Sequence, residues 1–155
     1  MENEDLRNLL SLLNKKYKQT DSIFHEIAWN FGISDSVFWI LYVLSEPEAE
    51  YTQYSLGHDW FYSKQTIHSA IGSLLRRGYV CLEETNENRG QKRIRLTETG
   101  KEFTRETIQK VKEAEMEALA AMEEEERKEF LRLTDKYLNA FHASSRLIRS
   151  KSSED

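Results

Sequence analysis

The side chains best suited to chemistry lie in one stretch near the middle of the chain, where polar groups and positive charge occur together. Residues 63–101 hold 8 basic and 4 acidic side chains, whereas residues 1–62 hold 4 basic and 10 acidic ones. The whole chain has a net charge of −5, so the basic block is a local feature of an acidic protein. Such a block favours a polyanionic partner, although a solvated basic surface would have the same composition.

Polar side chains gather where a helix is expected to begin. Ser63 is a good N-cap, and Gly78 suits the C-terminal end of the same helix. The predicted apolar stripe comprises Ile67, Ala70, Ile71, Leu74 and Leu75. The polar residues of the first turns are Lys64, Gln65, Thr66, His68 and Ser69. These side chains are candidates for contacts with DNA, and an ordinary exposed helix face is the alternative.

A basic β-hairpin is predicted directly after this helix. Residues 79–84 favour a strand, residues 86–90 have turn composition, and residues 91–97 alternate between apolar and polar side chains. The basic side chains of the hairpin are Arg89, Lys92, Arg93 and Arg95. Alternation places Arg93 and Arg95 on the same face, where they either contact phosphate or form a solvated or ion-paired strand surface.

Two helices are predicted before this region, and a third, shorter one leads into it. Apolar residues spaced by three and four predict a helix from about residue 5 to 29, which Gly32 ends. An almost wholly apolar helix should follow a cap at Ser34 or Asp35. Residues 51–60 are predicted to form the short helix.

Two helices are also predicted after the hairpin. Thr99 and Glu102 have the spacing of a capping box, which predicts a helix from about residue 100 to 122. Glu123–Glu126 suit the positive N-terminal end of a last helix.

Composition narrows the possible classes of protein. Apolar residues make up 39% and charged residues 32%, no apolar run approaches the ~20 residues of a membrane span, and the start lacks signal-peptide features. We therefore expect a soluble cytoplasmic protein with no membrane partner. Cys81 is the one cysteine and is expected in the core rather than in a redox role. The four histidines show no metal motif, so no metal or other cofactor is expected, although folding could assemble a metal site.

A helix with one polar side, preceded by a short helix and followed at once by a basic hairpin, predicts a winged helix–turn–helix. An α-helix fits the major groove of DNA, and a hairpin beside it can lay arginine on the backbone or in a narrow minor groove. The predicted fold class is therefore mainly α with a small β-hairpin wing, flanked by N- and C-terminal helices.

Four motifs resemble the multiple-antibiotic-resistance regulator (MarR) family. They are Ser63-Lys-Gln-Thr-Ile-His-Ser-Ala-Ile, Leu75-Arg-Arg-Gly-Tyr-Val, Asn88-Arg-Gly and Leu96-Thr-Glu-Thr-Gly. The resemblance covers nearly the whole chain. It implies a bacterial, cytoplasmic, non-enzymatic transcriptional regulator, a repressor that binds a pseudo-palindromic operator as a homodimer and that a small aromatic ligand releases.

The resemblance also assigns roles within the motifs. By position, Gln65, Thr66 and Ser69 correspond to residues that contact base edges, while Lys64 and His68 contact bases or phosphates. Arg89 matches the arginine of the family's wing, with Glu87 in the place of the usual aspartate, although a different gap would put Gly90 there. Together with Ser63, Lys92, Arg93 and Arg95, these residues form the predicted DNA-binding set.

Aromatic residues gather where the first two long helices should meet. They are Phe24, Trp29, Phe31, Phe38 and Trp39. Aromatic side chains at helical spacing usually form core. The resembling family has an effector cavity near this junction, so Phe24, Trp29, Phe31 and Trp39 are candidates to line a ligand pocket.

The expected organisation is one domain, with three classes of function to compare. The ranges are 1–149 for the domain, 34–99 for its winged-helix core, 5–31 and 100–149 for dimerisation helices, and 150–155 for a disordered tail. A DNA-binding regulator is favoured over a winged helix used only for protein assembly. An enzyme is disfavoured because no catalytic motif is found.

Overall fold

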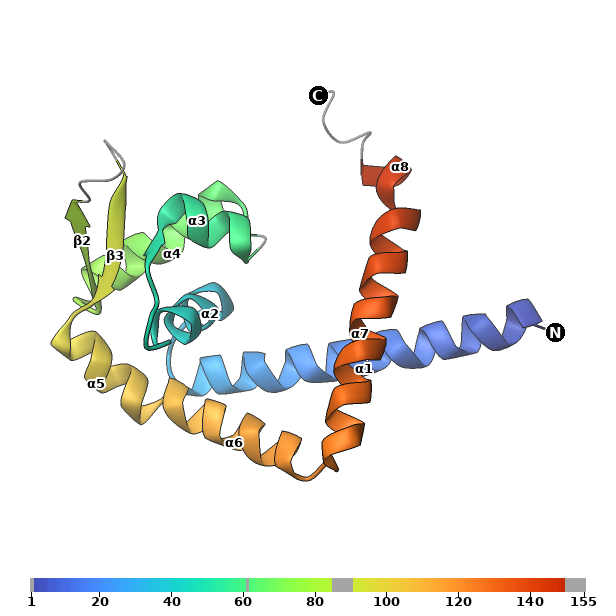
Figure 1. Cartoon of the computed structure of the whole chain (residues 1–155). Coiled ribbons are helices and arrows are strands. Elements are labelled where there is room, and N and C mark those ends of the chain that lie inside the picture. Colours follow the sequence, from blue (N-terminus) through green and yellow to red (C-terminus); the bar gives the residue numbers. More distant parts are fainter. Residues whose placement is uncertain (1, 61, 85–90, 150–155) are drawn as a thin grey trace. The chain divides into compact units, whose positions relative to one another are not determined.

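The structure is a computed structural model that describes residues 2–60, 62–84 and 91–149 (Figure 1). The chain divides into two compact units, Met1–Val111 and Lys112–Asp155. Helices dominate, and a small antiparallel sheet completes the fold, so the predicted class, mainly α with a hairpin wing, is confirmed. The tail predicted at residues 150–155 lies outside the described residues.

The two N-terminal helices form as predicted. Helix α1 (Glu2–Asn30) ends at a turn in which Gly32 has φ +67°, and α2 (Asp35–Leu44) follows. The Ser34 hydroxyl caps α2 by accepting a hydrogen bond from the Val37 N–H at 3.3 Å. The buried side chains of α2 are Val37, Phe38, Ile40, Leu41, Val43 and Leu44. Helix α2 is therefore the central helix of the core.

Helices α3 (Gln53–Asp59) and α4 (Lys64–Arg76) pack against each other, and α4 also packs against α2. Leu56 of α3 is 1% exposed, and α4 buries one apolar stripe: Ile67, Ala70, Ile71 and Leu74. The prediction that Leu75 belongs to that stripe is wrong, because its side chain is 40% exposed at the edge of the buried face. Gly78, just beyond α4, has a φ of +70°. Its predicted role at the C-terminal end of the helix requires this left-handed conformation, which glycine adopts without strain.

The sheet has three strands in the order β1-β3-β2, with β1 (Tyr51–Thr52), β2 (Val80–Glu84) and β3 (Lys92–Leu96) antiparallel to their neighbours. Both strands predicted for the hairpin are confirmed, whereas its turn at 86–90 lies outside the described residues. The predicted helix at 51–60 is wrong in its first two residues, which form β1. A strand this short leaves no periodicity in the sequence, and its partner β3 lies far along the chain.

The helix after the sheet begins earlier than predicted. Thr97, not Thr99, caps α5 (Glu98–Glu106), because the Thr97 hydroxyl accepts a hydrogen bond from the Gly100 N–H at 3.0 Å. The Glu102 carboxylate does not close a capping box and instead pairs with Arg105 at 2.7 Å.

One predicted helix is in fact two. Thr107 separates α5 from α6 (Ile108–Ala120), so the single helix expected from about residue 100 to 122 is wrong. The buried Thr107 hydroxyl donates a hydrogen bond to the Phe103 carbonyl oxygen at 2.6 Å. A threonine hydroxyl that bonds to the carbonyl four residues earlier is known to bend helices.

The second unit contains the rest of α6, α7 (Glu124–Ser144) and α8 (Arg146–Arg149). Helix α7 begins at the acidic run, as predicted. The Glu123 N–H donates a hydrogen bond to the Glu126 carboxylate at 2.8 Å, which caps the start of the helix. None of the described side chains of α7 is buried. Its exposed large apolar side chains are Phe130, Leu131, Leu133, Leu138 and Phe141.

Among the described residues, no single helix is both long and apolar enough to cross a membrane. Helices α1 and α2 reach those limits of length and composition only as a pair that bends by 88° between them.

Candidate nucleic-acid interface

The polar end of α4 is the centre of the candidate interface. The Ser63 hydroxyl accepts a hydrogen bond from the Thr66 N–H at 3.1 Å, which fixes the start of the helix. Its predicted contact residues are exposed or, for Thr66, half-buried: Ser63, Lys64, Gln65, Thr66, His68 and Ser69. The other side of α4 is anchored in the core, so these side chains stand on a rigid element. Its N-terminal end also carries the partial positive charge of the helix dipole.

The predicted cations of the wing stand on β3. Ile94 is 1% exposed and pairs in register with Leu82 of β2, so it faces the core. Arg93 and Arg95 flank Ile94 and therefore both lie on the outer face of the sheet, as alternation predicts. Lys92 is exposed at the start of the strand, while Arg89 lies outside the described residues.

The arginines on β3 are ion-paired within the chain. Glu50, the residue before β1, lies 3.1 Å from Arg93 and 3.4 Å from Arg95, and Glu83 of β2 lies 3.4 Å from Arg95. The structure thus has the ion-paired strand surface that was one of the two interpretations of these arginines. Contact with phosphate remains a prediction.

Cys81 does not lie in the core. Its side chain is exposed, which makes the predicted core position wrong. Cys81 pairs in register with Arg95, on the outer face of the sheet, whereas Val80 points inward and is 3% exposed. The run of β-favouring residues at 79–84 identified the strand, but it did not show which residues face inward.

The aromatic residues at the junction of α1 and α2 divide between core and cavity. Phe38 is fully buried, and Phe31 is half-buried against the core. Trp29 is 76% exposed, and Trp39 packs against Phe24 with ring centroids 4.7 Å apart. Trp29 and Trp39 line an open cavity of about 910 Å³, and Phe24 and Trp39 line a smaller one of about 440 Å³ beside it.

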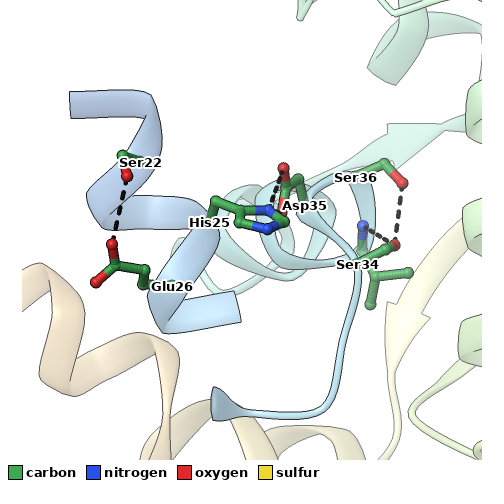
Figure 2. A network of polar contacts seen from close by, with 7 residues as sticks. Ser22, His25, Glu26, Ser34, Asp35 and Ser36 are labelled. Carbon is green, nitrogen blue, oxygen red and sulfur yellow. Dashed lines mark hydrogen bonds and ion pairs between the residues drawn. The ribbon is translucent and has the colours of Figure 1, made fainter. Parts of the chain in front are cut away.

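Polar groups at these cavities were not identified from the sequence. The Nδ1 atom of His25 lies 2.9 Å from the Asp35 carboxylate, which joins α1 to the first turn of α2 (Figure 2). Both side chains line the two cavities, and Tyr62 lines the larger one. Burial, and to a smaller extent the charge of Asp35, raises the pKa of the Tyr62 hydroxyl. His25 and Asp35 belong to no motif, so only the fold brings them together.

Among the described side chains, no group of three or more histidine, cysteine, aspartate or glutamate residues is placed to hold a metal ion.

Together, α3, α4 and the adjoining strands define a winged helix–turn–helix protein. No protein-family model and no curated protein sequence matches the chain. Solved structures do match it. A MarR family regulator from Neisseria meningitidis is 22% identical, with 94% of this chain and 97% of that chain covered and a TM-score of 0.66.

Two further matches were solved as complexes. A putative MarR family transcriptional regulator from Listeria monocytogenes, complexed with a 26mer DNA, is 19% identical, with 94% of this chain and 96% of that chain covered and a TM-score of 0.69. MarR from Staphylococcus aureus, in complex with salicylate and kanamycin, is 15% identical, with 92% of each chain covered and a TM-score of 0.66. The chain thus has the fold of MarR family transcriptional regulators, as its motifs predict.

Proposed function

We propose that this protein is a sequence-specific DNA-binding regulator of transcription. The observation that carries the proposal is that α4 exposes a polar N-terminal end while its apolar face is buried in the core. The hairpin that follows α4 includes β3, a strand that carries three basic residues. In this proposal α4 enters the major groove and the hairpin follows the backbone or the minor groove. The DNA complex of the structurally similar Listeria protein supports it. The proposed contacts are Ser63, Lys64, Gln65, Thr66, His68, Ser69, Arg89, Lys92, Arg93 and Arg95.

The proposed active form is a homodimer that acts as a repressor in the cytoplasm and has no enzymatic activity. Exposed leucines on α1 and exposed apolar side chains on α7 support a second copy as the cover for these faces. Burying apolar surface contributes about 25 cal/mol per Å², so pairing these faces is favourable. A two-fold dimer would present two α4 helices about 34 Å apart, one turn of DNA, to a pseudo-palindromic operator.

The cavity beside Trp29 and Trp39 is the proposed site for a small aromatic ligand that releases DNA. Its aromatic walls and the polar pair His25 and Asp35 support this assignment. The Staphylococcus aureus protein of the same fold was solved with salicylate. We expect such a ligand to quench tryptophan fluorescence and to weaken operator binding by about 1–3 kcal/mol. Quenching with no change in operator affinity would contradict the release.

The salt dependence of DNA binding tests the proposed function directly. If each protomer neutralises about 4 phosphates, the logarithm of affinity of the dimer should fall with the logarithm of salt concentration at a slope near −7. Fluorescence anisotropy of the full chain with labelled duplex DNA measures this slope. A slope near zero, or no binding, would instead favour a winged helix used for protein assembly.

A further inference from the structure

The outer face of the sheet contains a small cluster in which glutamates neutralise the arginines of β3. The Oε1 atom of Glu50 lies 3.1 Å from Nη1 of Arg93 and 3.4 Å from Nη2 of Arg95. The Oε2 atom of Glu83 lies 3.4 Å from Nε of Arg95. Two positive and two negative side chains therefore share one patch, and its formal charge is zero.

The strand order explains why these four side chains meet. Ile94 pairs with Tyr51 on one side and with Leu82 on the other, and it is buried. Because side chains alternate along a strand, the residues on both sides of Ile94 must face outward. The two-residue strand β1 brings the preceding Glu50 to one edge of β3, and β2 brings Glu83 to the other.

Only part of this cluster is shielded from water. The side chains of Arg93 and Arg95 are 25% and 36% exposed, whereas that of Glu50 is 57% exposed. Ion pairs this accessible contribute little to stability, so the fold does not require them. A guanidinium in such a pair can exchange its carboxylate for another anion, and phosphate accepts the same hydrogen bonds from arginine.

We infer that Glu50 competes with DNA phosphate for Arg93 and Arg95, and so holds down the affinity of the protein for DNA. The inference rests on the proposed function. In the free protein one Glu50 oxygen is within ion-pair distance of both guanidinium groups. A phosphate that binds the same N–H groups must displace this carboxylate, and a phosphate that binds the other N–H groups meets its negative charge. The wing therefore contributes less attraction than its basic residues suggest, which keeps binding to arbitrary DNA weak in an acidic protein.

The test compares Glu50→Gln with Glu48→Gln. Both substitutions remove one negative charge from the same exposed segment before β1, but Glu48 is not among the described carboxylates that pair with Arg93 or Arg95. Binding of each full-length variant to one labelled duplex is measured over a range of salt. Glu50→Gln is expected to tighten binding about three- to tenfold and to steepen the salt slope by up to about 0.9 per protomer. Glu48→Gln should change both much less.

Two further variants make the test specific to the arginines. Glu83→Gln removes a carboxylate that pairs with Arg95 but not with Arg93, so it should tighten binding less than Glu50→Gln does. In a chain that also carries Arg93→Ala and Arg95→Ala, Glu50→Gln should give no more than the Glu48→Gln effect. Thermal unfolding of each variant checks that it is folded.

The results that would contradict the inference differ from those that would contradict the proposed function. Equal effects of Glu48→Gln and Glu50→Gln would show general electrostatics and overturn the competition. Unchanged or weaker binding by Glu50→Gln would show that Glu50 is irrelevant or orients the arginines for DNA, and would also overturn it. In both cases the wild-type chain still binds DNA, so the proposed function stands. If no variant binds DNA, the proposed function fails and the inference fails with it.

Discussion

Single residues of the interface should differ in whether they determine the DNA sequence or only the strength of binding. Gln65 is exposed at the start of α4, and a glutamine amide can form two hydrogen bonds with adenine. We expect Gln65→Ala to cost about 1–3 kcal/mol on the preferred operator and to relax one base position in each half-site. Arg89→Ala should weaken binding to many sequences, with little change in the central consensus, and should reduce the salt slope by about 0.9 per protomer.

A panel of duplexes with single-base changes measures this difference. Gln19→Ala removes the same exposed side chain from α1 and serves as the control, with no expected effect on base preference. If Gln65→Ala weakened binding to every duplex by the same factor, then Gln65 would not select bases and the assignment of α4 would be wrong.

The positions of single residues were predictable from the sequence where a regular periodicity determines the direction of the side chains. Alternation was enough to put Arg93 and Arg95 on one face of β3. Their partner Glu50 was not predictable, because the short strand β1 that delivers it has no sequence signal. Cys81 shows the same limit, since composition favours a buried cysteine but the register of β2 turns it outward.

At the scale of elements, the junction between the sheet and α5 depends on close backbone contact. A Cβ added at Gly100 would overlap the Tyr79 carbonyl oxygen and lie 2.8 Å from the carbonyl carbon. Because backbone cannot move aside easily, Gly100→Ala should lower the free energy of unfolding by about 1–3 kcal/mol, as overpacking does. Urea unfolding followed by circular dichroism measures the change.

Gly72→Ala is the matched control for this junction. A Cβ at Gly72, inside α4, comes no closer than 3.4 Å to the flexible end of Arg76. Alanine favours helix over glycine by about 1 kcal/mol, so this variant should be unchanged or more stable. Equal destabilisation by both substitutions would show that loss of glycine, and not the contact with Tyr79, is responsible.

The elements themselves were largely predictable, because helical periodicity and caps such as Ser34 and Ser63 are local signals. The exact ends of these elements were less predictable where tertiary contacts determine them. Thr97 and Thr99 are both plausible caps in the sequence, but the Thr97 hydroxyl also donates to the Gly78 carbonyl oxygen at 2.5 Å. The break at Thr107 likewise depends on a side-chain hydrogen bond that competes with the helix.

At the scale of the whole molecule, the exposed apolar faces of α1 and α7 predict a homodimer. Leu9 is 61% exposed and Phe141 is 58% exposed. Glutamate at either position would place a charge in the buried interface, so Leu9→Glu and Phe141→Glu should give monomers that bind the operator weakly. Sedimentation at micromolar concentration measures the oligomeric state.

Ser11→Glu introduces the same charge on the opposite side of α1 from Leu9 and should leave the dimer intact. A wild-type chain that sediments as a monomer, or a Leu9→Glu variant that remains a dimer, would contradict the assignment of the α1 face.

Selection of DNA from a random duplex pool by the wild-type chain and by Gln65→Ala tests the central claim most directly, because it measures base choice and symmetry together. The proposed function predicts an enriched pseudo-palindrome whose half-sites lie about 10–10.5 base pairs apart. It also predicts that Gln65→Ala loses the preference at one position in each half-site. No enriched sequence, or one that Gln65→Ala leaves unchanged, would contradict sequence recognition through α4.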